Sequence, residues 1–140
     1  MLKLKIISVG KTKEEWLDSA IQEYVKRLKP TLTCEFVWTK NSEQLLQLAE
    51  KEPLCVSLDP NGALMNSEQF AHFVQNQFEK GGSRLTLIIG GAEGLPTKLK
   101  QSTSLISLSP LTLTHQLTRL VLMEQIYRAF EIIKGTKYHK

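Results

Sequence analysis

The stretch Leu85–Arg119, LTLIIGGAEGLPTKLKQSTSLISLSPLTLTHQLTR, decides the fold of this chain and holds its candidate site. It contains two apolar runs typical of strands, Leu85–Ile89 and Ser104–Leu108. Each run ends in glycines or hydroxylated residues, with GGAEG at 90–94 and SPLT at 109–112. Small residues of this kind stand where a ligand must approach the backbone. The two strand ends therefore predict a pocket.

Strand-like and helix-like patterns alternate along the rest of the chain. Further strands are expected at 2–9, 31–39 and 54–58, and helices at 13–28, 42–51, 67–80, 96–101 and 114–134. This alternation predicts a single α/β domain over 1–140, with a mostly parallel sheet flanked by helices. Ligands bind such sheets outside the carboxyl ends of the strands, so Leu58 and the two loops are expected to meet there.

Local signals add detail to three of these elements. Thr12 and Glu15 fit a capping box. The apolar face of the following helix is expected to contain Trp16, Leu17, Ala20, Ile21, Tyr24, Val25 and Leu28. The tetrapeptide at 59–62, Asp-Pro-Asn-Gly, predicts a turn directly after Leu58. The helix at 114–134 is apolar around more of its surface than one sheet can cover, which favours a homodimer over a deeply buried core helix.

Composition is that of an ordinary globular protein of 140 residues, 41% hydrophobic and 23% charged. No apolar run is long enough to span a membrane, and the N-terminus MLKLKIISVGK does not resemble a signal peptide. A cytoplasmic location with no membrane partner is therefore expected. Eighteen basic and fourteen acidic residues give a net charge of +4, which suits an RNA partner without requiring one. Cys34 and Cys55 lack the spacing of a metal site and are expected to be buried free thiols.

The glycine loop and the hydroxyl-rich loop are the candidate ligand contacts. The loop with Gly90 and Gly91 has neither a phosphate-binding Gly-Lys-Ser/Thr ending nor a dinucleotide fingerprint, and a tight turn is its alternative explanation. Glu93 in this loop is a candidate base or simply an exposed carboxylate. The run Leu108, Ser109, Pro110, Leu111, Thr112, Leu113 and Thr114 mixes apolar residues with hydroxyls, a neutral lining that suits a heterocycle such as adenine. A plain loop ending in a helix cap is the alternative for this run.

Titratable side chains follow this loop and recur at the C-terminus. His115 and Arg119 are four residues apart and share one helix face, where the imidazole could take a proton and the guanidinium could hold a phosphate. A surface or core histidine is the more ordinary interpretation. The tail from Gly135 to Lys140 contains Tyr138 and His139 among basic residues, which can stack on a base and meet phosphates. Fraying without function is its alternative.

Several segments together resemble the SPOUT-class RNA methyltransferases, and within that class a group of small bacterial enzymes. These segments are LIIGGAEG, SLSPLTLTHQLTRLVLMEQIYRAF, the terminal KYHK, and KIISVGK with its EYVKRL helix. The resemblance covers nearly the whole chain. It implies an α/β fold with a C-terminal trefoil knot, which general topology rules would not predict. It also implies a homodimer and S-adenosyl-L-methionine as cofactor.

The resemblance further implies methylation of N3 of a pseudouridine in 23S ribosomal RNA, within assembled ribosomes and without a metal. By motif, the cofactor residues would be Leu58, Gly90, Gly91 and 108–114. His115, Arg119, Tyr138 and His139 would lie near the substrate, with His115 as first candidate base and Glu93 as second. Arg119, Lys137 and Lys140 would position phosphates.

Two departures from the family pattern leave alternatives open. Thr114 stands where proline is usual, and the region around 40–51 is shorter than usual. A non-enzymatic ribosome-binding protein with the same fold is therefore one alternative. A methyltransferase acting on transfer RNA or on a small molecule is another.

Overall fold

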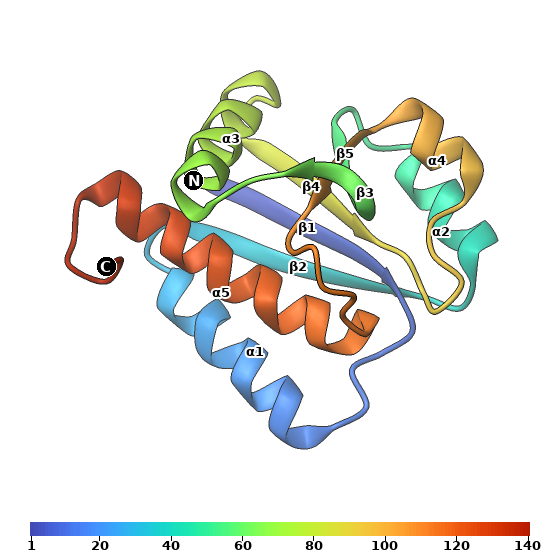
Figure 1. Ribbon diagram of the computed structural model, residues 1–140, viewed down its shortest axis with the longest axis horizontal. Coiled ribbons are helices and arrows are strands. Elements are labelled where there is room, and N and C mark those ends of the chain that lie inside the picture. Colours follow the sequence, from blue (N-terminus) through green and yellow to red (C-terminus); the bar gives the residue numbers. More distant parts are fainter.

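The computed structural model describes residues 1–140 and contains a parallel sheet between two layers of helices (Figure 1). Its strands are β1 (Leu2–Val9), β2 (Leu32–Thr39), β3 (Cys55–Leu64), β4 (Arg84–Ile89) and β5 (Ser104–Ser107). The helices are α1 (Glu15–Leu28), α2 (Ser42–Ala49), α3 (Ser67–Lys80), α4 (Thr97–Ser102) and α5 (His115–Lys134). The five strands have the order β2-β1-β4-β3-β5, and every neighbouring pair is parallel. The α/β prediction is confirmed.

Alternation along the strands divides the core between the two faces of the sheet. Leu4 and Ile6 of β1 belong to the larger apolar cluster, which α1, α3 and α5 cover. Ile7 belongs to a smaller cluster on the opposite face, beneath α2 and α4. Figure 1 shows α5 lying beside α1 across the sheet. Burying each such side chain contributes roughly 1.5–3 kcal/mol, so both layers are held by the apolar pattern.

Side-chain caps define three of the helices. Asn41 and Asn66 accept hydrogen bonds from the backbone N–H groups of Gln44 and Gln69, at 2.9 and 2.8 Å, at the starts of α2 and α3. Thr114 does the same for Leu117 at 3.2 Å, and α5 ends at Gly135 in the left-handed conformation. These helix boundaries agree with the sequence prediction.

The start of α1 differs from the prediction. Glu14 is the N-cap residue and makes no side-chain cap, so the capping box of Thr12 and Glu15 does not form. The Thr12 hydroxyl instead accepts a hydrogen bond from Arg119. Trp16, predicted on the apolar face, is 61% exposed. The first turn of α1 therefore extends beyond the edge of the core.

The turn predicted at 59–62 is also wrong. After Leu58 the chain remains extended, and β3 pairs again with β5 through Ala63 and Leu64. The residues between form an irregular segment of the ladder, where the register shifts. Gly62 is required there, because an added Cβ would lie 2.6 Å from the backbone of Ile106. The turn-forming residues at 59–62 therefore form a bulge in β3. This bulge changes the direction of the strand beside the ends of β4 and β5.

Both cysteines are free and half-buried. Burial raises the pKa of Cys34 to about 12 and that of Cys55 to about 11, so neither thiol ionises readily. No helix of the protein has the length and apolar character needed to cross a membrane.

Candidate functional site

A pocket of about 570 Å³ opens at the C-terminal ends of β4 and β5, beside the middle of β3 and against the first turn of α5. Its volume lies in the range of cofactor sites. The lining residues are Leu58, Asp59, Pro60, Ile89, Gly90, Gly91, Ala92, Gly94, Leu95, Ser107, Leu108, Ser109, Leu111, Thr112, Leu113, Thr114, His115 and Thr118. The structure thus brings together Leu58, both loops and His115, whereas Pro110 and Glu93 are not among these lining residues.

The loop after β5 is shaped by its own hydroxyl groups. Ser107 Oγ donates to the carbonyl oxygen of Ser109 at 3.0 Å, and Ser109 Oγ accepts from the N–H of Leu111 at 2.9 Å. Thr114 then caps α5. These bonds hold an extended loop whose remaining backbone groups can meet a neutral heterocycle.

The glycine loop after β4 is a tight turn that also lines the pocket. The N–H of Gly94 donates to the carbonyl oxygen of Gly91 at 2.9 Å. An added Cβ at Gly90 would lie 2.7 Å from the carbonyl carbon of Gly94, so this position needs glycine for the turn itself. A Cβ at Gly91 would meet the Val9 side chain at 3.2 Å. Glu93 of this loop is exposed.

His115 is the first residue of α5 and faces the pocket. Burial, followed by the positive charges of Arg119 and Lys13, lowers the pKa of this imidazole below 6.5. The position at a helix N-terminus acts in the same direction. A lowered pKa keeps the ring neutral at physiological pH, and a neutral ring can accept a proton.

Arg119 lies behind His115 and is completely buried. Its Nη2 donates to the carbonyl oxygens of Val9 and Gly10 at 2.8 and 2.7 Å, and to Ser8 Oγ at 3.0 Å. Nη1 donates to Thr12 Oγ1 and Gln116 Oε1 at 3.1 and 3.2 Å. Burial lowers the pKa of this guanidinium to about 10, which still leaves it charged at neutral pH.

This guanidinium also stacks on an aromatic ring, since its central carbon lies 4.6 Å from the centroid of the Trp38 ring. No surface of Arg119 is left to meet a phosphate, which is the contact expected from the sequence. Its donors instead fasten the end of β1 to α5.

Asp59 is a pocket residue that the sequence interpretation missed. The tetrapeptide at 59–62 was interpreted as a turn, whereas the side chain of Asp59 lines the pocket and is only 8% exposed. The available signal was its position, since it is the first polar residue after an apolar strand at the edge where ligands bind.

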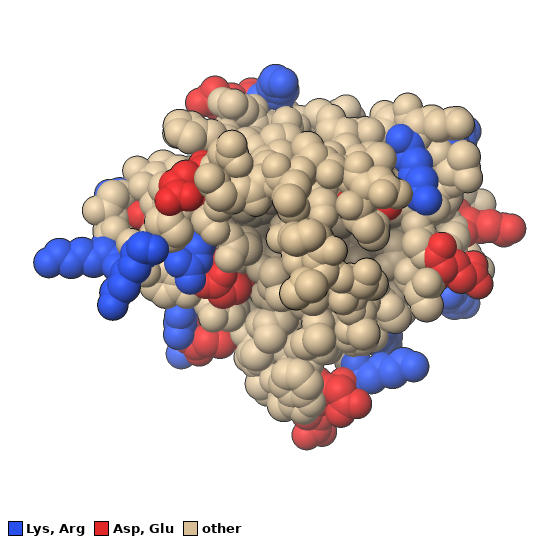
Figure 2. Space-filling model, viewed as in Figure 1, with Lys and Arg blue, Asp and Glu red and all other residues tan.

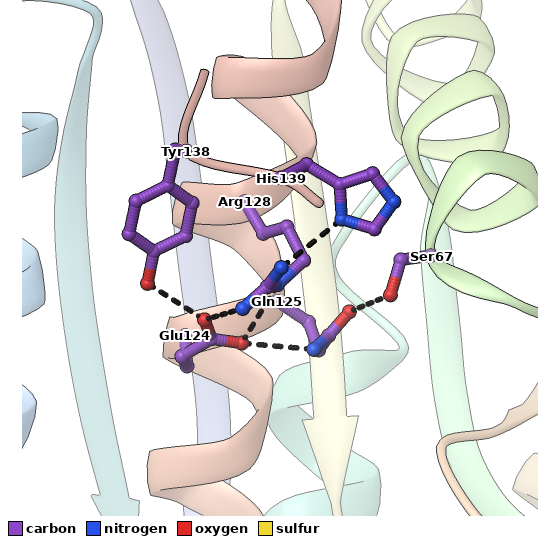
Figure 3. Close-up of polar contacts among 6 residues, drawn as sticks. All are labelled: Ser67, Glu124, Gln125, Arg128, Tyr138 and His139. Atoms are coloured by element: carbon purple, nitrogen blue, oxygen red, sulfur yellow. Dashed lines mark hydrogen bonds and ion pairs between the residues drawn. The ribbon is translucent and has the colours of Figure 1, made fainter. Parts of the chain in front are cut away.

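The C-terminal tail is folded back on α5 rather than frayed (Figure 3). The hydroxyl of Tyr138 donates to Glu124 Oε2 at 2.8 Å, and Arg128 Nη2 donates to the same oxygen at 2.8 Å. Arg128 Nη1 lies 3.0 Å from His139 Nδ1. Arginine only donates, so His139 Nδ1 is the acceptor and His139 Nε2 donates to Glu68 at 2.8 Å. Burial and the Glu124 carboxylate both raise the pKa of Tyr138, which keeps it a donor.

The docked tail is distant from the pocket. Glu124 and Arg128 are nine and thirteen residues beyond His115 on one helix. At the helical rise, this corresponds to about 14 and 20 Å along the axis. The structure therefore does not bring Tyr138 and His139 together with His115.

Charged side chains are arranged around an uncharged band of surface. Figure 2 shows that the middle of this face, over β3 and the first half of α5, is largely free of charged atoms, with acidic and basic groups at its rim. Leu117 of α5 and Leu64 of β3 are exposed apolar residues of these elements.

Comparison with known proteins agrees with this geometry. Residues 2–139 match a family model described as "Predicted SPOUT methyltransferase". The chain is 61% identical over 140 residues to "Ribosomal RNA large subunit methyltransferase H" of Protochlamydia amoebophila, with 100% of both chains covered. It is 40% identical over 159 aligned residues to the protein of the same name from Halothermothrix orenii, covering 99% of this chain and 100% of that one.

Solved structures share the fold at low sequence identity. TrmJ from Z. mobilis ZM4 superposes with a TM-score of 0.57 at 12% identity, over 89% of this chain and 69% of that one. Lpg2936 from Legionella pneumophila, solved in complex with the bound cofactor SAM, superposes with a TM-score of 0.52 at 14% identity. That match covers 92% of this chain and 66% of the other.

Proposed function

Because this chain belongs to the SPOUT methyltransferase family, we propose that it transfers a methyl group from S-adenosyl-L-methionine (SAM) to 23S ribosomal RNA, at N3 of a pseudouridine. The observation that carries the proposal is the pocket at the strand ends, which combines a neutral loop lining with a neutral histidine. Full-length similarity to proteins named as ribosomal RNA methyltransferases supports the substrate class. The proposed setting is the assembled ribosome or large subunit in the cytoplasm.

The pocket residues fit SAM in size and chemistry. Leu58, Gly91 and the loop at 108–114 would hold the adenosine part through backbone groups and apolar contact. When bound, SAM supplies a methyl group activated by its positively charged sulfur.

His115 is the proposed base. The imide N3 of pseudouridine carries a proton at neutral pH, and this proton must leave as the N–C bond forms. The imidazole of His115 stands at the mouth of the pocket with a lowered pKa, so it can take that proton. Glu93 is less suitable, because it is exposed and does not line the pocket.

We propose that the active form is a homodimer joined through the uncharged band. Leu117 of α5 is exposed although the helix is otherwise well packed, and the charge-free surface continues onto β3, where Leu64 is exposed. An apolar area of this kind on a small protein favours association with a second copy. In such a dimer, the tail of one copy would serve the pocket of the other, since the docked tail lies far from its own pocket.

The trefoil knot stays part of this proposal as a family expectation. The loops at 90–94 and 108–114, which would form it, line the pocket here. The Thr114 departure does not weaken the enzymatic proposal, because Thr114 caps α5 and continues to line the pocket.

The decisive experiment measures tritium incorporation from labelled SAM into ribosomes that lack the native methyl group. We expect incorporation into 23S RNA of assembled ribosomes, mapped to N3 of one pseudouridine. Calorimetry with SAM accompanies it. SAM binding without incorporation into ribosomes, transfer RNA or free 23S RNA would favour a non-enzymatic ribosome-binding protein instead.

A further inference from the structure

The pocket contains one carboxylate that no other group in the protein neutralises. Asp59 stands where the register of the β3–β5 ladder shifts, and a bulge of this kind redirects a side chain out of the ladder. Only 8% of Asp59 is exposed, yet it forms none of the side-chain hydrogen bonds or ion pairs of this structure. No fully enclosed side-chain oxygen of the protein lacks a partner, so the carboxylate oxygens of Asp59 face the open space of the pocket.

The rest of the lining carries no compensating charge. No lysine, arginine, glutamate or second aspartate lines the pocket, and His115 is the other titratable residue there. The only buried cation of the protein, Arg119, points its donors at the end of β1 and at Gln116. A buried carboxylate normally has a charged or hydrogen-bonding partner. A ligand group that enters the pocket can therefore serve as the partner of Asp59.

We propose that Asp59 recognises the positive charge of the cofactor, so that the pocket prefers the sulfonium of SAM to the neutral thioether that methyl transfer leaves. This inference rests on the proposed function. In the transfer, the N3 lone pair forms a bond to the methyl carbon, the carbon–sulfur electrons move to sulfur, and the N3 proton passes to His115. The cofactor therefore loses one positive charge, and the product, S-adenosylhomocysteine, differs from SAM only by the methyl group and that charge.

The carboxylate of Asp59 is well placed to distinguish SAM from S-adenosylhomocysteine by charge. Coulomb attraction is strong where solvent is excluded, and the 8% exposure of Asp59 meets that condition. Hydrogen bonding of Asp59 to ribose hydroxyls would treat SAM and its product alike, because both carry the same ribose. The ratio of the two affinities therefore separates recognition of charge from recognition of sugar.

The test is calorimetry of the full-length protein with SAM and with S-adenosylhomocysteine, comparing wild type with Asp59→Asn. The amide keeps the shape of the side chain and removes its charge. We expect SAM to bind at least tenfold more weakly to the variant, with the affinity for S-adenosylhomocysteine changing less than threefold. Asp18→Asn is the matched control, because it removes the other aspartate of the chain from an exposed site on α1 and should leave both affinities unchanged.

Equal weakening of both ligands, or no weakening of either, would overturn the assignment. Thermal unfolding checks that the variant is folded. If Asp59→Asn does not fold, Asp59→Ser provides the same comparison with a smaller neutral side chain. Wild-type protein that binds neither ligand would contradict the proposed function itself, whereas wild-type binding with an unchanged ratio in the variant contradicts only the role of Asp59.

Discussion

His115 and Arg119 share one face of α5 but have different roles, one at the pocket and one in the structure. His115 and Arg119 are one helical turn apart, and the sequence suggested that both act on the substrate. Arg119 is enclosed and holds the end of β1, whereas His115 reaches the pocket. The two are still coupled, because the charge of Arg119 contributes to lowering the pKa of His115. Besides burial, which is the larger cause, the enclosed Arg119 therefore helps to keep the proposed base neutral.

The first prediction concerns the pH dependence of transfer. The pKa of His115 is lowered, so the neutral and active form prevails above a pH that lies below 6.5. We expect kcat to rise with pH below 6.5 and to be constant between about pH 7 and 8. His115→Gln should lower kcat by about 10²–10⁴-fold and remove the acid limb. A wild-type rate that keeps rising tenfold per pH unit above 7 would point to hydroxide rather than His115.

The second prediction concerns stability. Arg119→Met leaves the carbonyl oxygens of Val9 and Gly10 without their donor, and an unsatisfied buried group costs about 1–3 kcal/mol. We expect a loss of about 3 kcal/mol or more in the free energy of unfolding, measured with urea. Arg27→Met is the control, because its ion pair with Glu23 is exposed and should contribute less than about 1 kcal/mol. A loss below about 1 kcal/mol at Arg119 would show that water replaces its contacts.

At the scale of the elements, α5 combines three tasks along one length. Its first turn borders the pocket, its buried side contacts α1 and α3, and Glu124 and Arg128 in its middle turns hold the docked tail. The remaining side exposes Leu117. This division explains why the apolar pattern of the helix is wider than a single sheet requires.

Charge placed on this exposed side should separate the dimer. Leu117 is 40% exposed, so Leu117→Glu can be accommodated in a folded protomer, but it would bury a carboxylate in the proposed interface. We expect sedimentation to show a monomer at micromolar concentration with an unchanged circular dichroism spectrum. Gln47→Glu adds the same charge on α2, on the other face of the sheet, and should remain dimeric. A dimer that persists in Leu117→Glu would locate the interface elsewhere.

The fold and most of the pocket could be predicted from the sequence because local patterns determine them. Apolar alternation identified the strands, and Asn41, Asn66 and Thr114 marked helix starts through bonds to residues three positions away. The errors involve partners distant in the sequence. The Thr12 hydroxyl accepts a hydrogen bond from Arg119 instead of capping α1, and residues 59–62 lie between two stretches of β3 that pair with β5. Asp59 was missed for the same reason, since only tertiary structure brings it into the pocket.

At the scale of the whole molecule, the pocket and the tail lie apart within one chain, although both are proposed to contribute to the active site. The tail is held by Glu124 and Arg128 of α5 and by Glu68 of α3, well beyond the first turn of α5 that carries His115. In a two-fold symmetric dimer, the tail of one copy can lie at the pocket of the other while both tails stay docked on their own helices. Each active site would then need both copies.

Mixed dimers test this arrangement. Deleting residues 137–140 should slow methyl transfer at least tenfold through the loss of stacking and phosphate contacts, while SAM affinity stays within a few-fold. His115→Gln should also be inactive. Equal mixing of the two inactive proteins should restore about a quarter of the wild-type activity, because half of the dimers contain one complete site. Absence of recovery, with mixed dimers demonstrated by native mass spectrometry, would mean that each tail serves its own protomer.

The contacts of Arg119 also bear on when the protein can become active during its synthesis. This side chain joins α5 to residues 8–10, more than a hundred positions earlier in the chain. Chains fold from the N-terminus as they are made, at about 5–20 residues per second. Several seconds therefore pass between the synthesis of the end of β1 and that of Arg119, whose side chain binds it. The pocket is incomplete while α5 is still in the exit tunnel. Ribosome-bound chains arrested before residue 119 should be cleaved by protease near Val9, whereas released chains should resist, so a newly made copy cannot act on the ribosome that is still making it.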